Sequence, residues 1–124
     1  MRTAYRDGGG FEEAAAYSRA VRIGSHIAVS GTAARGGGDA YAQTTEALQR
    51  ALAAAQELGA SRDDVLRTRL LLAPGCDWES VIDAHRETFA GVEPANTTYF
   101  VAGFIPEGVL VEVELDAIAP DPPR

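Results

Sequence analysis

Apolar and polar residues alternate near the start of the chain in two short segments. Ala20, Val21 and Ile23 precede a Gly-Ser pair, and residues 26–31 continue the alternation after it. This period of two, interrupted by a tight turn, predicts two strands joined as a β-hairpin. The residues before the hairpin show no sustained period, so we expect residues 1–16 to form a flexible lead-in.

Two longer segments have apolar residues at helical spacing. Asp39 is a residue type that caps helix N-termini, and the helix that it would begin spans residues 40–58 and ends before Gly59. A second helix is predicted from Asp77 to Ala90, where apolar residues recur three and four positions apart. Each helix has one apolar face, which we expect to pack on a sheet.

Three further segments have the composition of strands. They are residues 64–73, 97–104 and 109–118, and an Ile-Pro-Glu-Gly turn between the last two predicts a second hairpin. The proline-rich residues 120–124 cannot continue a sheet. The order strand, strand, helix, strand, helix, strand, strand predicts one α+β domain over residues 17–119, with two helices on one face of a mixed sheet.

The opposite face of this sheet carries charge. In the last strand three acidic residues alternate with apolar ones, and in the third strand two arginines alternate with leucines. The charged residues are Glu112, Glu114, Asp116, Arg67 and Arg69, and the leucines are Leu66, Leu70 and Leu72. The pattern fits either a solvated face with weak cross-strand ion pairs or a subunit interface in which the charges set the register.

The composition and net charge of the chain exclude several kinds of function. The 124 residues include 18 acidic and 11 basic side chains, a net charge of −7, and every basic residue is arginine. A net acidic chain disfavours nucleic-acid binding, and the absence of lysine excludes an internal Schiff base. No apolar run approaches the roughly 20 residues of a membrane-spanning helix, and the first residues do not resemble a secretory signal. We therefore expect a cytoplasmic protein without a membrane partner.

Cysteine and histidine are scarce. Cys76 is the single cysteine, which excludes an intrachain disulfide, and we interpret it as a small residue at a helix start. His26 and His85 lie far apart in the sequence, so we expect no metal site. His85 lies on or beside the apolar stripe of the second helix, where a hydrogen-bonded structural role is favoured over a catalytic one.

Six short segments follow one another in an order typical of a known family. They are residues 17–24 (YSRAVRIG), 27–32 (IAVSGT), 58–61 (LGAS), 64–68 (DVLRT), the Pro-Ala pair at 94–95, and 111–114 (VEVE). Together they resemble the RidA (YjgF) family over residues 17–119. The resemblance implies a chorismate-mutase-like protomer and a homotrimer with three intersubunit clefts for a small-molecule ligand, which favours the interface interpretation of the charged face.

The resemblance also implies an activity, the cofactor-free hydrolysis of reactive enamines and imines such as 2-aminoacrylate to 2-oxo acids and ammonia. In active members a glutamate positions the attacking water, a tyrosine and a serine shape the pocket, and an arginine after Pro-Ala clamps the substrate carboxylate. The implied site has Glu112 as its catalytic residue and no metal. Its substrate-binding residues are Tyr17, Ser30, Gly31, Phe89, Asn96 and Thr98.

Asn96 is the main departure from the family pattern, because it stands at the arginine position. An arginine–carboxylate pair in a partly desolvated cleft contributes about 2 to 4 kcal/mol, of which a neutral amide recovers only part. The chain thus looks like the Arg-lacking members of the family, and we expect simple 2-imino acids to be poor substrates. Arg19, Arg67 and Arg69 are candidates to replace the missing clamp.

Two functional hypotheses stay open. The first is hydrolysis of an enamine or imine other than a simple 2-imino acid, and the second is a non-catalytic trimer that binds a small molecule or a protein. The ribonuclease label that some relatives carry is disfavoured, because the chain is acidic, has no lysine and lacks a histidine pair for general acid–base catalysis.

Overall fold

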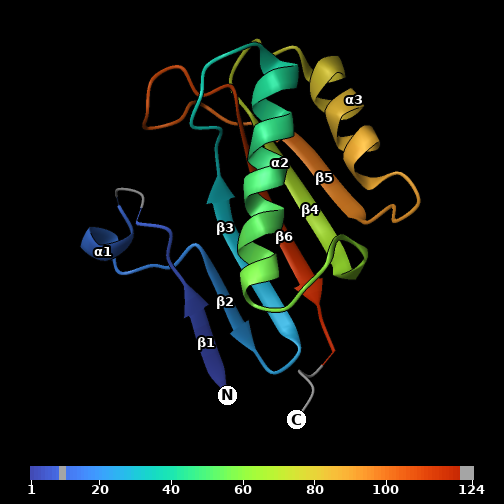
Figure 1. Ribbon diagram of the computed structural model, residues 1–124. Coiled ribbons are helices and arrows are strands. Elements are labelled where there is room, and N and C mark those ends of the chain that lie inside the picture. Colours follow the sequence, from blue (N-terminus) through green and yellow to red (C-terminus); the bar gives the residue numbers. More distant parts are fainter. Residues whose placement is uncertain (9–10, 121–124) are drawn as a thin grey trace.

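The computed structural model describes residues 1–8 and 11–120 and contains one six-stranded sheet with two long helices. The strands are β1 (Arg2–Tyr5), β2 (Ala20–Ile23), β3 (His26–Thr32), β4 (Val65–Leu72), β5 (Ala95–Phe100) and β6 (Val111–Ile118). The helices are α1 (Glu12–Ala15), α2 (Ala40–Glu57) and α3 (Trp78–Phe89), with a 3-10 turn at Arg62–Asp64. Helices α2 and α3 cover the same face of the sheet (Figure 1), which confirms the predicted α+β class. The tail prediction falls mostly on residues 121–124, outside the described residues.

The strand order is β1-β2-β3-β6-β4-β5, and every neighbouring pair is antiparallel except β4 and β5. The first predicted hairpin, β2–β3, is confirmed, but the second is wrong because β4 lies between β5 and β6. Strand β5 follows β4 through helix α3, and such a helical crossover returns the chain parallel to the preceding strand. The turn residues after β5 therefore belong to a longer connection rather than to a hairpin loop.

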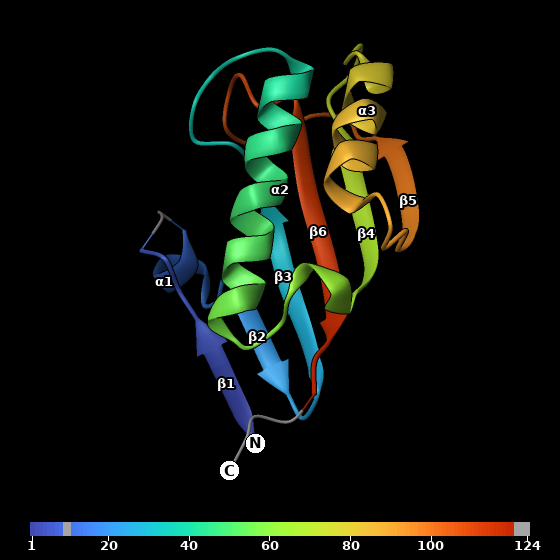
Figure 2. The same ribbon diagram turned by 45° about the vertical axis from the view of Figure 1, so that its right-hand side comes forward.

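Helices α2 and α3 begin where their caps predict. The carboxylates of Asp39 and Asp77 each accept a backbone N–H bond from the residue three positions on, at 2.9 and 3.3 Å. The core between helices and sheet (Figure 2) includes Leu48, Leu70 and Leu115, whose side chains are fully buried. No helix in the described part of the chain is long and apolar enough to cross a membrane.

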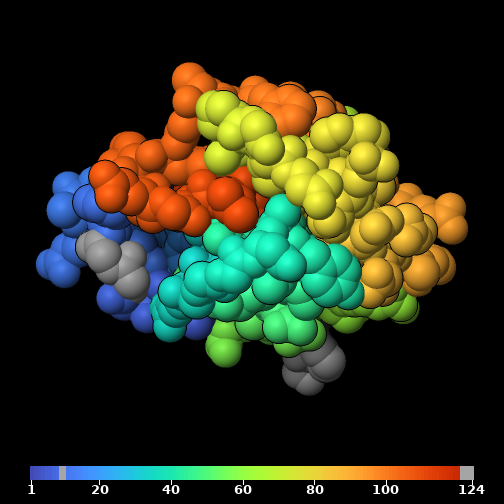
Figure 3. Space-filling model, turned by 90° about the horizontal axis from the view of Figure 1, so that it is seen from above, coloured from blue at the N-terminus to red at the C-terminus, as the bar shows by residue number. Residues whose placement is uncertain are grey.

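Residues 1–8 and 11–16 form more regular structure than the sequence predicts, and residues 9–10 of the predicted lead-in lie outside the described residues. Where we expected a flexible lead-in, β1 pairs antiparallel with β2, and α1 buries Glu12, whose carboxylate lies 3.2 Å from Nε of Arg19. A four-residue strand is too short to show a period, and a buried ion pair leaves no periodic signal. Figure 3 shows these residues, in blue, against the connection between β5 and β6, in orange and red.

The helix-free face of the sheet is charged as predicted. Glu112, Glu114 and Asp116 of β6 are half-buried, and Nη1 of Arg69 on β4 lies 3.6 Å from Glu114 and 3.7 Å from Asp116. One part of the predicted alternation is wrong, since Leu66 is 57% exposed. The register between β4 and β6 shifts just before Arg67, and this irregularity turns Leu66 outward.

Arg22 links the turn after β2 to the end of α2 and to the residues after β6. Its side chain is buried, and it donates to the carbonyl oxygens of Gly24 at 2.8 Å, Leu58 at 2.7 Å and Pro120 at 2.8 Å. The Leu58 carbonyl is one of those left without a partner at the end of α2. A Cβ at Gly59 would approach Nη1 of Arg22 to 2.8 Å, so this close contact requires glycine.

We predict that Arg22→Ala lowers the free energy of unfolding by about 3 kcal/mol, because it removes a buried guanidinium and leaves three partly buried carbonyl groups without its donors. Urea denaturation at a fixed protein concentration measures the change. Arg86→Ala is the matched control, since the Arg86 side chain is 64% exposed and, among the described residues, its ion pair is with Asp83 on the same helix. We expect a loss of about 0.5 kcal/mol or less for the control. Equal losses of unfolding free energy in the two variants would contradict the stabilising role of Arg22.

Candidate functional site

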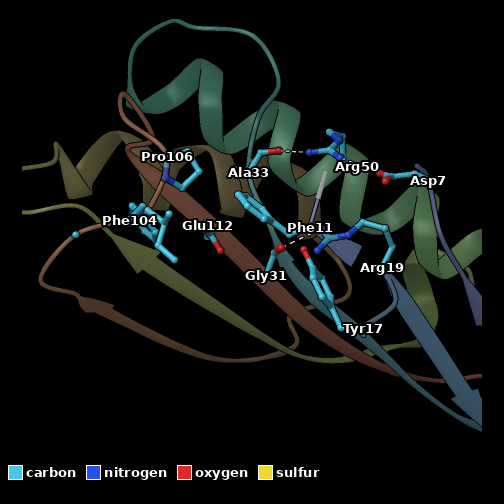
Figure 4. Close-up of a pocket in the computed structure, with 12 residues that line it drawn as sticks. Asp7, Phe11, Tyr17, Arg19, Gly31, Ala33, Arg50, Phe104, Pro106 and Glu112 are labelled. Atoms are coloured by element: carbon cyan, nitrogen blue, oxygen red, sulfur yellow. Dashed lines mark hydrogen bonds and ion pairs between the residues drawn. The ribbon is translucent and has the colours of Figure 1, made fainter. Parts of the chain in front are cut away.

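A pocket of about 400 Å³ opens at one end of the sheet (Figure 4). It is formed by Asp7, residues 11–19, the end of β3, the middle of α2, the connection after β5, and β6. Its lining residues are Asp7, Phe11, Tyr17, Arg19, Gly31, Ala33, Arg50, Gly103, Phe104, Ile105, Pro106 and Glu112. This volume is within the range of small-molecule sites. The pocket brings together three predicted site residues, Tyr17, Gly31 and Glu112.

Glu112 and Gly31 lie in close contact at this end of the sheet. The register between β3 and β6 shifts between Val29 and Thr32, so Gly31 lies in an irregular stretch beside Glu112. A Cβ built on Gly31 would lie 2.6 Å from Oε1 of Glu112. Glycine at position 31 therefore provides the space that the Glu112 carboxyl occupies.

The electrostatic surroundings favour a protonatable Glu112. Burial raises the pKa of its carboxyl above the ordinary value, the nearby Arg19 partly opposes this shift, and Glu114 adds to it. A carboxylate with a raised pKa is a stronger base and takes a proton more readily. A group of this kind, facing a pocket, is suited to general acid–base chemistry.

Arg19 forms the wall beside this carboxyl. It is only 9% exposed, and Nη1 donates to the Gly31 carbonyl at 2.9 Å and to the Thr32 hydroxyl at 3.2 Å. Its guanidinium carbon lies 5.5 Å from the centre of the Tyr17 ring, within the range of a cation–π contact. Of the three arginines considered as replacement clamps, Arg19 alone lines this pocket.

Ser30 has a structural position. Its hydroxyl donates to the carbonyl oxygen of Ser18 at 2.6 Å, and its own carbonyl accepts a bond from the Thr32 hydroxyl at 2.7 Å. The first bond joins the residues before β2 to β3, and the second lies within the end of β3. Ser30 is not among the residues that line it.

Asn96 and Thr98 line a different hollow of about 340 Å³, between β5 and α3. The Thr98 hydroxyl donates to Oδ1 of Asn96 at 2.7 Å, and Nδ2 of Asn96 donates to the Thr68 hydroxyl at 3.0 Å. Thr68 lies 2.7 Å from Nε2 of His85. These side chains are on the helix-covered side of the sheet, whereas Glu112 alternates with the buried valines of β6 and faces the other side. One protomer thus keeps Asn96 and Glu112 apart.

Phe89 is a core residue in this protomer. It is 2% exposed, and its ring centre lies 5.0 Å from that of His85, so its side chain reaches neither pocket. Burial lowers the pKa of His85, which favours the neutral ring that can accept the Thr68 proton. Thr68 gives His85 the hydrogen-bond partner that its predicted structural role requires.

Two charged residues of the pocket were outside the predicted site. Arg50 of α2 and Asp7 after β1 both line it, and Nη2 of Arg50 lies 2.9 Å from Oδ2 of Asp7. The sequence carries no signal for this pair, because a helix-surface arginine and a loop aspartate are common solvated residues. Among the described residues, no group of three or more His, Cys, Asp and Glu side chains could hold a metal ion.

These features define a small α+β domain with an acid-bearing pocket at one end of its sheet. The family model described as Endoribonuclease L-PSP matches residues 10–119, and the chain belongs to this family, which is also called YjgF or RidA. An uncharacterized protein of Streptomyces coelicolor is 40% identical over 118 residues, which cover 90% of this chain and 88% of the relative. A RutC family protein of Pyrococcus abyssi is 30% identical over 105 residues, covering 79% and 82%.

Solved structures agree with this assignment. The crystal structure of a YjgF/YER057c/UK114 family member from Mycobacterium tuberculosis is 39% identical, with a TM-score of 0.91, and the match covers 96% of this chain and all of that one. A YjgF family member from Neisseria meningitidis is 21% identical, with a TM-score of 0.84 and 98% coverage of both chains. At that identity the second likeness supports the fold alone.

We predict that Gly31→Ala displaces the Glu112 carboxyl while the domain stays folded, because the clash falls on the end of a flexible side chain. The carboxyl carbon shift of Glu112, followed by NMR through a pH titration, measures the displacement. Gly37→Ala is the matched control, since nothing lies within 4 Å of a Cβ at that position. A titration of Glu112 that is identical in Gly31→Ala and the parent would contradict the predicted contact.

Proposed function

We propose that this protein hydrolyses an enamine or imine other than a simple 2-imino acid, without a cofactor, in a cleft between subunits. The observation that carries this proposal is the half-buried Glu112, with its raised pKa, facing the 400 Å³ pocket. Family membership supports it, because the position of Glu112 matches the water-positioning glutamate that the resemblance implies. The substrate is a small molecule, and neither nucleic acid nor a membrane is part of the reaction.

In the proposed reaction, the Glu112 carboxylate accepts a proton from water as the water oxygen bonds to the imine carbon. The former imine nitrogen takes this proton back from the Glu112 carboxyl and becomes an amine, which gives a carbinolamine and restores the carboxylate. Its hydroxyl proton then passes to Glu112 as the C–N bond breaks, and ammonia leaves with a proton returned from the acid. The products are a carbonyl compound and ammonia, so atoms and charge balance without any redox step.

The surroundings of Asn96 support the exclusion of simple 2-imino acids. Its amide already bonds to Thr68 and Thr98, and a neutral amide binds a carboxylate more weakly than a guanidinium does. A substrate of this site would not depend on an anion-binding group at position 96. Its carboxylate, if it has one, would have to be recognised elsewhere.

The proposed cleft requires a second copy of the chain. Within one protomer β4 separates β5 from β6, so Asn96 and Thr98 meet Glu112 only if the β5 edge of one subunit approaches the pocket of the next. The half-buried charges of Arg69, Glu114 and Asp116 on the helix-free face are suited to a subunit contact. We therefore propose a homotrimer.

A non-catalytic trimer of the same fold is the second candidate. It is favoured by the bonds that engage both ends of the Asn96 amide, since a side chain held by its own protein contributes shape rather than chemistry. The endoribonuclease activity in the family description is less well supported. The described residues that line the 400 Å³ pocket include no histidine, and the chain has a net charge of −7.

We predict a rate of imine hydrolysis that falls on the acid side through a pKa above that of ordinary glutamate, because only the carboxylate form can act as the base. A flavin amine oxidase releases an imine from an arylalkyl amine, and semicarbazide trapping competes with its hydrolysis. The parent should reduce trapping, and Glu112→Gln should lose about 100-fold or more of this activity. Simple 2-imino acids released by an amino-acid oxidase should be poorer substrates.

Glu79→Gln is the control for this experiment, because Glu79 lies on the surface of α3 away from the pocket. It should retain the parent's rate and pH profile. If the parent does not reduce trapping of any imine, the binding-trimer hypothesis replaces hydrolysis. Activity of Glu112→Gln equal to that of the parent would contradict the role of Glu112.

We predict a particle of three times the protomer mass of 13.1 kDa. Light scattering at micromolar concentration measures it. Arg69→Ala removes the cation that faces Glu114 and Asp116 and leaves like charges together, so it should shift the trimer towards smaller species at low protein concentration. A parent that stays monomeric would contradict the proposed cleft.

A further inference from the structure

The guanidinium of Arg50 lies in the same pocket as Glu112. It projects from α2, where Nη1 donates to the carbonyl oxygen of Ala33 and Nη2 lies 2.9 Å from Oδ2 of Asp7. Figure 4 shows Glu112 and Phe104 on one side of the pocket and Arg50 with Asp7 on the other. A basic group and the acid–base candidate therefore occupy separate ends of one hollow.

Arg50 has the donors that an anion needs. The bonds to Ala33 and Asp7 engage two of the five N–H groups of its guanidinium, and 23% of the side chain is exposed. Arg19 differs, because it is 9% exposed and is held by Glu12, Gly31 and Thr32. Of these two pocket arginines, Arg50 is thus the accessible one.

Asp7 shows which chemistry fits this place. Its Oδ2 accepts bonds from Nη2 of Arg50 at 2.9 Å and from Nη2 of Arg35 at 3.2 Å. Arg19, Arg35, Arg50 and Asp7 also line an adjoining hollow of about 270 Å³. Three guanidinium groups therefore gather at this end, with Asp7 and the buried Glu12 as their facing carboxylates. A carboxylate oxygen already sits in bonding geometry here.

Apolar side chains line the same pocket as these charged groups, together with Tyr17 and Arg19. Phe11, Phe104, Ile105 and Pro106 contribute to the lining, and Ile105 is 92% exposed. Such a lining favours hydrocarbon over a polar chain. The substrate segment between an anion at Arg50 and a reacting carbon at Glu112 would then be aliphatic or aromatic.

We propose that Arg50 binds the carboxylate of the substrate, which is an imine or enamine whose carboxylate is separated from the reacting carbon by an apolar segment. This inference rests on the proposed function and names its substrate class. It also explains how a chain with Asn96 can still recognise an acid, since the anion binds at α2 within the protomer rather than at β5. Asp7 competes with the substrate carboxylate for Arg50 and tunes the affinity.

Calorimetric binding of oxo acids tests the proposal without requiring turnover. The probe is 4-oxopentanoate, which resembles the carbonyl product of such an imine, and its methyl ester is the uncharged comparison. Arg50→Gln should weaken 4-oxopentanoate binding by about 10-fold or more, and Asp7→Asn should tighten it several-fold. Arg86→Gln, on the exposed surface of α3, should leave it unchanged. The ester should bind all variants equally.

Each outcome decides the proposal. Equal affinity of the parent for acid and ester, unchanged binding in Arg50→Gln, or no binding of 4-oxopentanoate to the parent overturns it. Inorganic phosphate that binds as tightly as the acid overturns the carboxylate assignment. If Arg50→Gln does not fold, the effect of Asp7→Asn on 4-oxopentanoate affinity decides. Tighter binding supports the proposal, and unchanged or weaker binding overturns it. Glu112→Gln separates the two proposals, because acid binding should persist in it while hydrolysis is lost.

Discussion

The buried guanidinium of Arg19 is the interaction on which the candidate site depends. Its Nε pairs with Glu12 and anchors α1, while Nη1 holds the Gly31 carbonyl and the Thr32 hydroxyl at the end of β3. These bonds fix the irregular stretch that places Gly31 against Glu112. The same positive charge opposes the effect of burial on the pKa of Glu112, so the carboxyl can still ionise.

The parallel pairing of β4 with β5 determines where the predicted site residues lie relative to one another. Because α3 connects these strands, β5 becomes an edge strand and β6 a central one. Asn96 then lies on the helix-covered face of the edge strand. Glu112 lies on a central strand and points to the opposite face of the sheet. Asn96 and Glu112, which the sequence predicts as parts of one site, therefore lie in two separate hollows of the protomer. They can meet only across an interface between subunits.

Periodic burial made most of the fold predictable from the sequence. Both helices with their aspartate caps, the first hairpin and the charged face of β6 follow from local patterns. The second hairpin was mispredicted because a turn sequence does not reveal which strand its flanks pair with. Strand β1 and the Glu12–Arg19 ion pair were not predicted, because a short edge strand and a buried ion pair leave no hydrophobic periodicity in the sequence. The family resemblance indicated Glu112, which lines the pocket, but not Arg50, since only the folded chain brings α2 to the pocket.

The proposed catalytic residue and the proposed anion-binding residue lie on parts of the fold that differ in how readily they tolerate substitution. Glu112 lies on β6, where a neighbouring strand on each side fixes its position. Asn96 lies on the edge strand and Arg50 on the partly exposed surface of α2, where a substitution disturbs less of the core. The anion-binding residue can therefore occupy different positions in different family members, while the glutamate keeps its position on β6. Shared fold and a shared glutamate do not by themselves fix the substrate of a family member. If Arg50 binds the substrate carboxylate as we propose, the spacing between Glu112 and this guanidinium decides which acids the pocket accepts.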